Sequence, residues 1–166
     1  AFEDAGLQIE SLRGSKTGVF VGGFCLDNKL LQLSGHNRRL IDSYTPTSST
    51  MAIMSNRLSY VFDLKGPSIT IDTACSSSLV AIHYACESIL RGDSEMAIAA
   101  GVNIMLKPEY FIAMSKGGFL SKHCRCMAFD ERAGGYARGE GVGALILKPL
   151  EKAIADRDAI HAIISA

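Results

Sequence analysis

The chain has 166 residues, 48% hydrophobic and 20% charged, and its 17 basic residues balance its 17 acidic ones. This composition predicts a globular protein with one domain-sized core, and it argues against disorder, a fibrous class and a nucleic-acid partner. No apolar run reaches the ~18 to 20 residues of a membrane span and the first residues lack a secretory pattern, so we expect a cytoplasmic protein with no membrane contact. The five cysteines are irregularly spaced, which indicates reduced thiols.

The first part of the chain predicts a buried strand followed by helices. The apolar run over residues 17–23 ends in glycines, which is typical of a buried strand. The polar stretch after it predicts mostly loop, with one short helix over 27–32. Over residues 48–62 we expect a helix capped by Ser48 or Ser49. Apolar residues recur there at helical spacing, which indicates core packing: Met51, Met54, Leu58 and Val61.

From residue 68 onward, strands and helices alternate. Alternation of this kind predicts an α/β fold with a mixed, largely buried sheet. The polar loop over residues 119–140 points to a functional role, since loops longer than about 12–15 residues are uncommon in compact domains. The expected strands cover 68–72, 95–105, 142–148 and the segment from Ala159, and the expected helices cover 76–91, 109–116 and 150–157.

Cys75 stands where the predicted strand gives way to the predicted helix. The free N–H groups of a first helical turn, with the positive end of the helix dipole, favour a thiolate at this place. Cys75 is therefore a candidate nucleophile, although the pattern alone also fits a small buried hydrophobe. Asp72 and Thr73 are expected to form local hydrogen bonds that fix the turn.

The segment Asp72-Thr-Ala-Cys-Ser-Ser-Ser-Leu79 resembles the nucleophile signature of the β-ketoacyl synthases, the condensing enzymes of fatty acid and polyketide assembly. The triple serine is closer to type I polyketide synthases and animal-type fatty acid synthases than to the discrete bacterial enzymes. The resemblance continues in order along the whole chain through Ser55-Asn-Arg-Leu-Ser-Tyr60, Gly66-Pro-Ser68, Ala100-Gly-Val-Asn103, Lys107-Pro-Glu-Tyr-Phe111, Ala128-Phe-Asp130 and Arg138-Gly-Glu-Gly-Val-Gly143.

The resemblance implies the thiolase-like fold, in which two similar halves stack as helix, sheet, helix, sheet and helix layers. Residues 1–166 would supply the first half and the start of the second. We therefore interpret them as the N-terminal portion of a β-ketoacyl synthase domain, truncated at both ends. The complete domain is expected to be a homodimer with the Ser68–Thr73 strand near its twofold interface.

The family's chemistry implies the role of Cys75. The cysteine would take an acyl chain from a carrier-protein thioester, and a carbanion from a decarboxylated malonyl-type thioester would then extend the chain. The N–H of Cys75 would form half of an oxyanion hole. The expected partners are acyl carrier proteins bearing phosphopantetheine and covalently flanking synthase domains, with no bound cofactor. We favour polyketide over fatty acid synthesis.

None of the four histidines is expected to be the catalytic base. His83 lies about 12 Å beyond Cys75 along the predicted helix, at ~1.5 Å per residue. The two side chains are therefore too far apart to share a proton. His36, His123 and His161 lack the neighbours of the family's two histidine motifs, which the resemblance places further along a complete domain. We therefore expect no condensation activity from residues 1–166 alone.

Two further residues are assigned by the resemblance. It implies that Phe129 is a gate at the acyl pocket and that Glu140 is a buried acidic residue bracing the active-site network. The alternatives are that Phe129 is an ordinary core residue and that Glu140 is a solvated surface charge. No metal is expected, because the three candidate ligands within residues 123–126 lack a fourth. The glycines within residues 139–143 precede a predicted strand, whereas a dinucleotide-binding loop follows one, so we expect no dinucleotide site here.

Two other functions remain open from the sequence. The first is a cysteine hydrolase, or an acyltransferase of another class, that uses Cys75 with a histidine outside these residues. The second is a non-catalytic role, as a chain-length partner or a structural fragment. In the family's chain-length partners the nucleophile is replaced, so Cys75 argues against that role.

Overall fold

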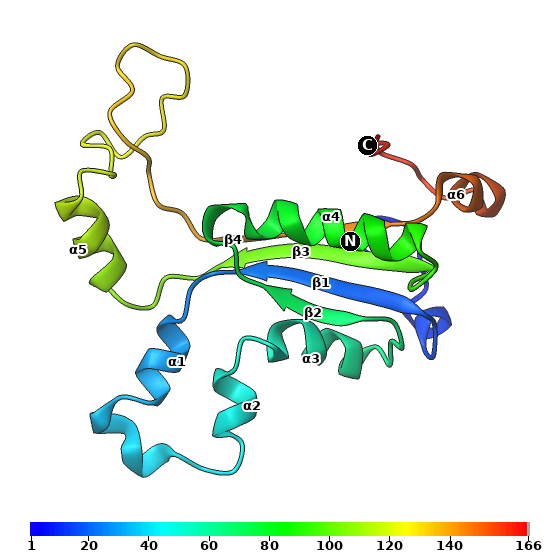
Figure 1. The fold of residues 1–166 in the computed structure, drawn as a ribbon, viewed down its shortest axis with the longest axis horizontal. Helices are drawn as coiled ribbons and strands as arrows, with labels where there is room; N and C mark the ends of the chain where they lie inside the picture. Colours follow the sequence, from blue (N-terminus) through cyan, green and yellow to red (C-terminus); the bar gives the residue numbers. More distant parts are fainter. Residues whose placement is uncertain (166) are drawn as a thin grey trace.

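The structure is a computed structural model that describes residues 1–165, and its framework is a four-stranded sheet (Figure 1). Strands β1 (Thr17–Gly23), β2 (Ser68–Ile71), β3 (Met96–Asn103) and β4 (Gly141–Leu147) lie in the order β2-β1-β3-β4. β1 pairs in parallel with β2 and β3, whereas β4 runs antiparallel to β3. The predicted mixed sheet of an α/β fold is confirmed.

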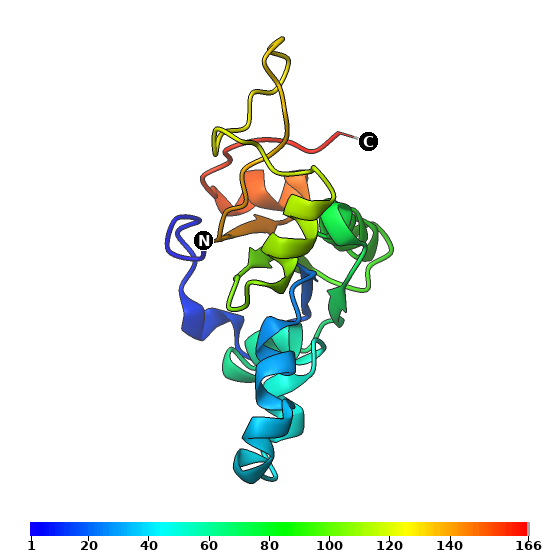
Figure 2. The same cartoon turned by 90° about the vertical axis from the view of Figure 1, so that its left-hand side faces the viewer.

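Helices connect the strands and cover both faces of the sheet. α4 lies along one face and α3 along the other, while α1, α2 and α5 extend beyond the strand ends (Figures 1 and 2). None of the helices in residues 1–165 is long and apolar enough to cross a bilayer. The α-helices are α1 (Asp27–Gln32), α2 (Thr45–Ser49), α3 (Ile53–Val61), α4 (Ser77–Leu90), α5 (Glu109–Lys116) and α6 (Leu150–Asp156), and 3-10 turns cover Ile9–Leu12, Gly35–Leu40 and Ala74–Ser76.

β1 is buried along its whole length and separates two apolar clusters. Successive side chains of a strand point to opposite faces. Phe20 therefore packs on the α4 face against Ala81 and Ala85, whereas Val19 and Val21 pack on the face that α3 covers. The sheet is less buried than predicted, because the first five residues of β4 are exposed.

The helix predicted over residues 48–62 is interrupted. α2 ends at Ser49, α3 begins at Ile53, and Thr50 between them is extended, with φ −91° and ψ 132°. Ser48 and Ser49 are thus not caps of the second helix, because their hydroxyls donate back to the Thr45 carbonyl. Of the predicted apolar stripe, Met54 and Leu58 pack against the core, while Val61 is exposed.

The strand predicted from Ala159 is wrong for the described residues. Up to residue 165 this segment forms no ladder with another strand. A strand needs a neighbouring edge to satisfy its backbone groups, and β4, the nearest edge, pairs only with β3 here. The segment instead returns toward the chain start, where His161 lies 3.0 Å from the Asp4 carboxylate.

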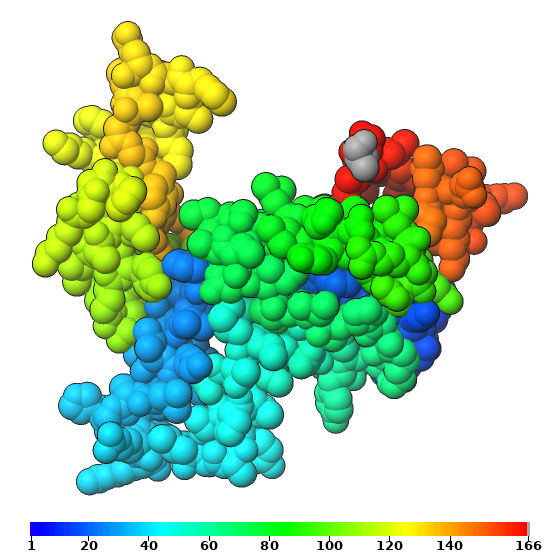
Figure 3. Space-filling view, in the orientation of Figure 1, coloured from blue at the N-terminus to red at the C-terminus, as the bar shows by residue number. Residues whose placement is uncertain are grey.

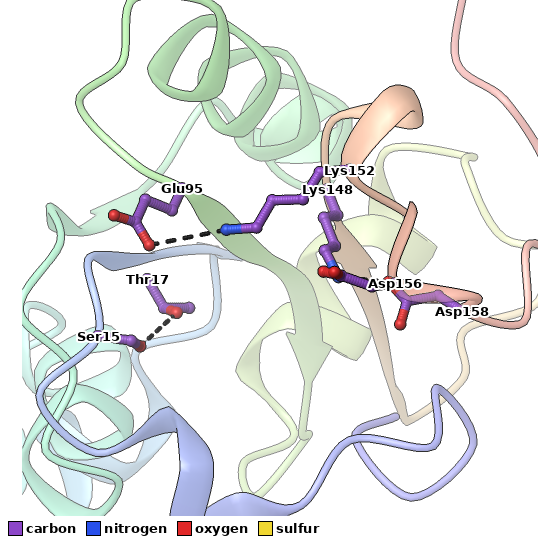
Figure 4. Close-up of polar contacts among 7 residues, drawn as sticks. All are labelled: Ser15, Thr17, Glu95, Lys148, Lys152, Asp156 and Asp158. Atoms are coloured by element: carbon purple, nitrogen blue, oxygen red, sulfur yellow. Dashed lines mark hydrogen bonds and ion pairs between the residues drawn. The ribbon is translucent and has the colours of Figure 1, made fainter. Parts of the chain in front are cut away.

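Ion pairs attach α6 to the sheet (Figure 4). The Lys148 ammonium, just after β4, lies 2.5 Å from carboxylate oxygens of both Asp156 and Asp158. Burial lowers the pKa of Lys148, but its hydrogen bonds to the two carboxylates outweigh that effect, so the net pKa is raised. The hydrogen bond from Lys148 lowers the pKa of Asp156. Lys152 of α6 lies 3.8 Å from Glu95, which precedes β3.

Candidate active site

Cys75 lies at the strand-to-helix turn predicted from the sequence. The 3-10 turn Ala74–Ser76 follows β2 and leads directly into α4. Ala74 has a φ of 56°, in the left-handed region that is costly for alanine. Cys75 itself is exposed. The backbone therefore turns sharply just before the cysteine and leaves it accessible, as a nucleophile requires.

Side-chain hydrogen bonds hold this turn. Asp72 Oδ1 accepts from the Ala74 N–H at 3.0 Å, and the Thr73 N–H donates to Ser77 Oγ at 2.9 Å. The local bonding roles predicted for Asp72 and Thr73 are thus confirmed. Within residues 1–165, no hydrogen bond uses the N–H of Cys75, which leaves that donor available to an oxyanion.

Glycines let the first turn of α4 lie on the sheet. A Cβ on Gly22 of β1 would stand 2.5 Å from the Ser78 nitrogen. A Cβ on Gly101, its partner on β3, would stand 2.7 Å from the Ser78 Cβ. Both distances are too short for real contacts, so a side chain at either position would push α4 away. Cys75 is therefore held at the carboxyl ends of β1 and β3, where open α/β sheets bind ligands.

A cavity of about 810 Å³ opens beside Cys75. Gly101 and Gly143, which are paired across β3 and β4, line it on the face that α4 covers. A Cβ on Gly143 would meet no atom within 4 Å. Met114 of α5 and the end of the 119–140 loop complete the lining. Figure 3 shows the molecule hollowed between the start of α4 and the part that carries α5 and this loop.

Glu140 lines the cavity but is not buried as predicted. Its Oε1 accepts from the Met105 N–H at 2.6 Å, and the neighbouring Gly139 carbonyl accepts from Asn103 Nδ2 at 2.6 Å. The side chain remains exposed because no described element packs over this end of β4. Glu140 thus ties two loops together, while its part in an active-site network stays a prediction.

Phe129 does not line the cavity. Its side chain is fully exposed, and its φ is 64°. A backbone bridge between Leu120 and Tyr136 closes the base of the loop, and the residues beyond that bridge project away from the sheet (Figures 1 and 2). The pocket position expected for Phe129 is therefore not present in this structure, and a gating role remains a prediction.

The histidines lie away from the cavity, and none of the four lines it. His83 on α4 packs edge-on against Tyr84, with ring centroids 5.5 Å apart. A second cavity, of about 440 Å³, lies between α4, β4 and residues 158–164 and includes His161 and Cys86. Cys86 is half-buried, and this burial raises the pKa of its thiol.

Asp27 was not identified from the sequence. It is 3% exposed, and its Oδ2 accepts from the N–H groups of Leu106 and Lys107, both at 2.9 Å. The sequence offers only an acidic residue in the first turn of a short helix, which is usually a solvated position.

Comparison with known proteins decides the family. The sequence model described as "Beta-ketoacyl synthase, N-terminal domain" matches residues 1–153. The chain belongs to the beta-ketoacyl synthase family. The hybrid PKS-NRPS synthetase xenE of Xenoacremonium sinensis is 53% identical over 164 residues, which are 99% of this chain and 4% of that protein. The non-reducing polyketide synthase olcA of Penicillium canescens is 50% identical over 166 residues, which are 100% of this chain and 7% of that protein.

Solved ketosynthases share the fold. The oxazolomycin ketosynthase domain OzmH KS7 of Streptomyces albus JA3453 matches 95% of this chain with a TM-score of 0.86 and 44% identity. The ketosynthase from module 6 of the bacillaene synthase of Bacillus subtilis 168 matches 96% with a TM-score of 0.82 and 41% identity. The expected thiolase-like fold of the beta-ketoacyl synthase family is thereby confirmed. The chain spans about a quarter of these two ketosynthase structures, 27% and 26%.

Proposed function

We propose that this chain is part of a condensing ketosynthase in a type I polyketide synthase and that Cys75 carries the growing acyl chain. The observation that carries the proposal is the exposed cysteine at a strained strand-to-helix turn beside a cavity of about 810 Å³. Membership of the beta-ketoacyl synthase family supports it. The relatives' identities as polyketide and hybrid PKS-NRPS synthases favour polyketide over fatty acid synthesis.

Acyl loading uses groups seen at the turn. The Cys75 thiolate attacks the carbonyl carbon of an acyl thioester held on the phosphopantetheine arm of an acyl carrier protein. The N–H of Cys75 donates to the oxyanion of the tetrahedral intermediate. When that intermediate collapses, the carrier's C–S bond breaks, its thiolate leaves, and the acyl group remains on Cys75. Cys75 is exposed, so a thioester held on a carrier arm can reach its sulfur.

Chain extension follows on the acylated cysteine. A malonyl-type thioester loses carbon dioxide, and the resulting carbanion attacks the acyl carbonyl carbon. A carbon–carbon bond forms, the bond to the Cys75 sulfur breaks, and the thiolate is regenerated. We propose that histidines outside residues 1–166 assist decarboxylation, since none of the described residues 1–165 that line the cavity is a histidine. Residues 1–166 are proposed to bind no cofactor.

The proposed partners are acyl carrier proteins, the flanking domains of a multidomain synthase and a second copy of the domain. β2 forms one edge of the sheet, so its outer backbone groups have no strand partner within residues 1–165. Ile69 on this strand is 45% exposed. An exposed apolar edge invites pairing, which supports a dimer through the Ser68–Thr73 region.

A two-step assay on the intact synthase tests the proposal. The protein is loaded with an acyl carrier thioester, excess donor is removed, and a malonyl carrier thioester is added. A condensing enzyme releases carbon dioxide and yields a β-keto chain two carbons longer. A cysteine hydrolase would release free acid and form no longer chain, and that result would overturn the proposal. Cys75→Ala should abolish both steps.

A further inference from the structure

Asp27 connects the loops that leave two neighbouring strands. It opens α1, just after β1, and is 3% exposed. Its Oδ2 accepts from the N–H groups of Leu106 and Lys107, each at 2.9 Å, in the loop after β3. Since β1 and β3 are adjacent and parallel, both loops leave the sheet at the carboxyl ends of the strands, where Cys75 lies.

Oδ2 of Asp27 is satisfied by backbone N–H groups. No ion pair involves it among residues 1–165, and the ammonium of Lys107, whose N–H donates to Asp27, pairs with Glu109 at 2.6 Å. A buried carboxylate is costly unless its oxygens accept hydrogen bonds. Removing it would in turn leave two N–H groups without an acceptor. The contact therefore fixes the position of the loop after β3.

That loop continues into the wall of the Cys75 cavity. Met105 precedes the residues held by Asp27, and its N–H donates to Glu140 Oε1 at 2.6 Å. Its sulfur accepts from Arg138 Nε at 3.2 Å. Glu140 and Arg138 both line the cavity. A continuous set of contacts thus runs from Asp27 through Met105 to the cavity wall.

The nucleophile turn is fixed by a different set of contacts. Asp72 bonds to the Ala74 N–H, and Gly22 and Gly101 seat the first turn of α4. None of these contacts includes Asp27. Loosening the loop after β3 should therefore disturb the cavity wall more than the turn.

We infer that Asp27 is a positioning residue that sets the shape of the acyl cavity through residues 105–107. This inference rests on the proposed function, because it assigns the cavity to the acyl chain. A long acyl chain contacts more of the cavity wall than a short one. Loss of Asp27 should therefore weaken the seating of long chains selectively.

The test compares two acyl lengths on the full-length synthase. Acetyl and octanoyl carrier thioesters are each offered with a saturating malonyl carrier thioester, which regenerates the Cys75 thiolate, and kcat and KM for the acyl donor are measured for each. For Asp27→Ala we expect the ratio of the octanoyl KM to the acetyl KM to rise at least about fivefold. Asp27→Asn keeps a carbonyl oxygen that can accept both N–H groups, so its ratio should stay within about twofold of wild type.

Asp42→Ala is the matched control. Asp42 Oδ1 also accepts two backbone N–H groups, from Tyr44 at 2.9 Å and Thr45 at 3.0 Å, but within one turn that does not line the cavity. Its KM ratio should equal that of wild type. Asp27→Glu, which keeps the charge but displaces the oxygens by one methylene, gives the same test if Asp27→Ala does not fold, and its ratio should also rise.

The outcomes separate the two proposals. Acyl loading of wild-type Cys75 is measured first and tests the proposed function alone. With normal wild-type loading, an unchanged KM ratio in Asp27→Ala, or in Asp27→Glu if the alanine variant is unfolded, would overturn the positioning role. An Asp27→Asn variant as altered as Asp27→Ala would also overturn it, because the hydrogen-bond acceptor would then not be what matters.

Discussion

Gly22 of β1 lies directly against the backbone between Ser77 and Ser78 of α4. A Cβ on Gly22 would stand 2.5 Å from both the Ser77 carbonyl carbon and the Ser78 nitrogen. The helix that follows Cys75 can approach the sheet this closely only because β1 carries no side chain there. The position of Cys75 therefore depends on a residue in a different strand.

Gly22→Ala should disturb both stability and acyl loading. The added methyl group would collide with backbone atoms, so α4 must shift, and we expect a loss of about 1–3 kcal/mol in the free energy of unfolding. Denaturant titration and the rate of Cys75 acylation measure the two effects. Gly35→Ala is the control, since a Cβ there would meet nothing within 4 Å. Wild-type behaviour of Gly22→Ala would contradict the tight packing.

Ala74→Gly should stabilise the turn that carries Cys75. Ala74 has a φ of 56°, a conformation that glycine adopts without the penalty paid by alanine, so we expect a gain of up to about 1 kcal/mol. Ala81→Gly, in the buried middle of α4, should instead lose at least about 1 kcal/mol through weaker helix propensity and lost packing. Thermal unfolding of both variants shows whether the two changes have opposite signs. Equal destabilisation would mean that Ala74 is not strained.

Elements with strong local signals were predicted closely. The helices over 27–32 and 109–116 have the predicted bounds, and Pro108 marks the start of the second. Cys75 was placed correctly because a β-branched strand and a helix meet at one residue. Signals of this kind lie within a few neighbouring positions of the chain, so the sequence alone can reveal them.

Features that depend on distant residues could not be predicted in this way. Asp27 is buried because it meets N–H groups 79 and 80 positions further along the chain. A strand from Ala159 would need an edge to pair with, which a local apolar pattern cannot supply. The burial expected for Glu140 and the pocket position expected for Phe129 likewise depend on elements packed over them.

The ion pairs of Lys148 should make the attachment of α6 depend on pH. Because the pKa of Lys148 is raised, its contribution to the stability of the α6 attachment is complete below about pH 10.4 and is lost as pH rises through the raised pKa. Because the pKa of Asp156 is lowered, its contribution to the stability of the α6 attachment is complete above about pH 3.9 and is lost as pH falls through the lowered pKa. Hydrogen-exchange protection of α6 should therefore be greatest between these limits.

Asp156→Asn is the matched test of that window. It removes one carboxylate beside Lys148, so the decrease in α6 protection on the acid side should shrink, while the decrease above pH 10 should persist through Asp158. Both decreases are measured as protection factors of the α6 amides, corrected for intrinsic exchange rates. Identical acid profiles for wild type and Asp156→Asn would show that this ion pair does not hold the helix.

Alkylation should distinguish the exposed cysteine from the half-buried ones. Burial raises the pKa of the Cys25 and Cys86 thiols, so each forms less thiolate at pH 8 than an ordinary cysteine and should react slowly with iodoacetamide. Cys75 is exposed and should react faster. Peptide mapping separates it from Cys124 and Cys126, which are also exposed. Labelling of Cys25 or Cys86 as rapid as that of Cys75 would contradict the burial seen here.

Whether Cys75 carries the acyl chain is tested most directly by mapping the acyl group on the full-length protein. The protein is incubated with an acyl carrier thioester, digested and examined by mass spectrometry. We predict one acyl group on the peptide that contains Cys75, released by hydroxylamine and absent from Cys75→Ala. A wild-type Cys75 peptide without an acyl group, or the same peptide still acylated in Cys75→Ala, would contradict the role of this cysteine.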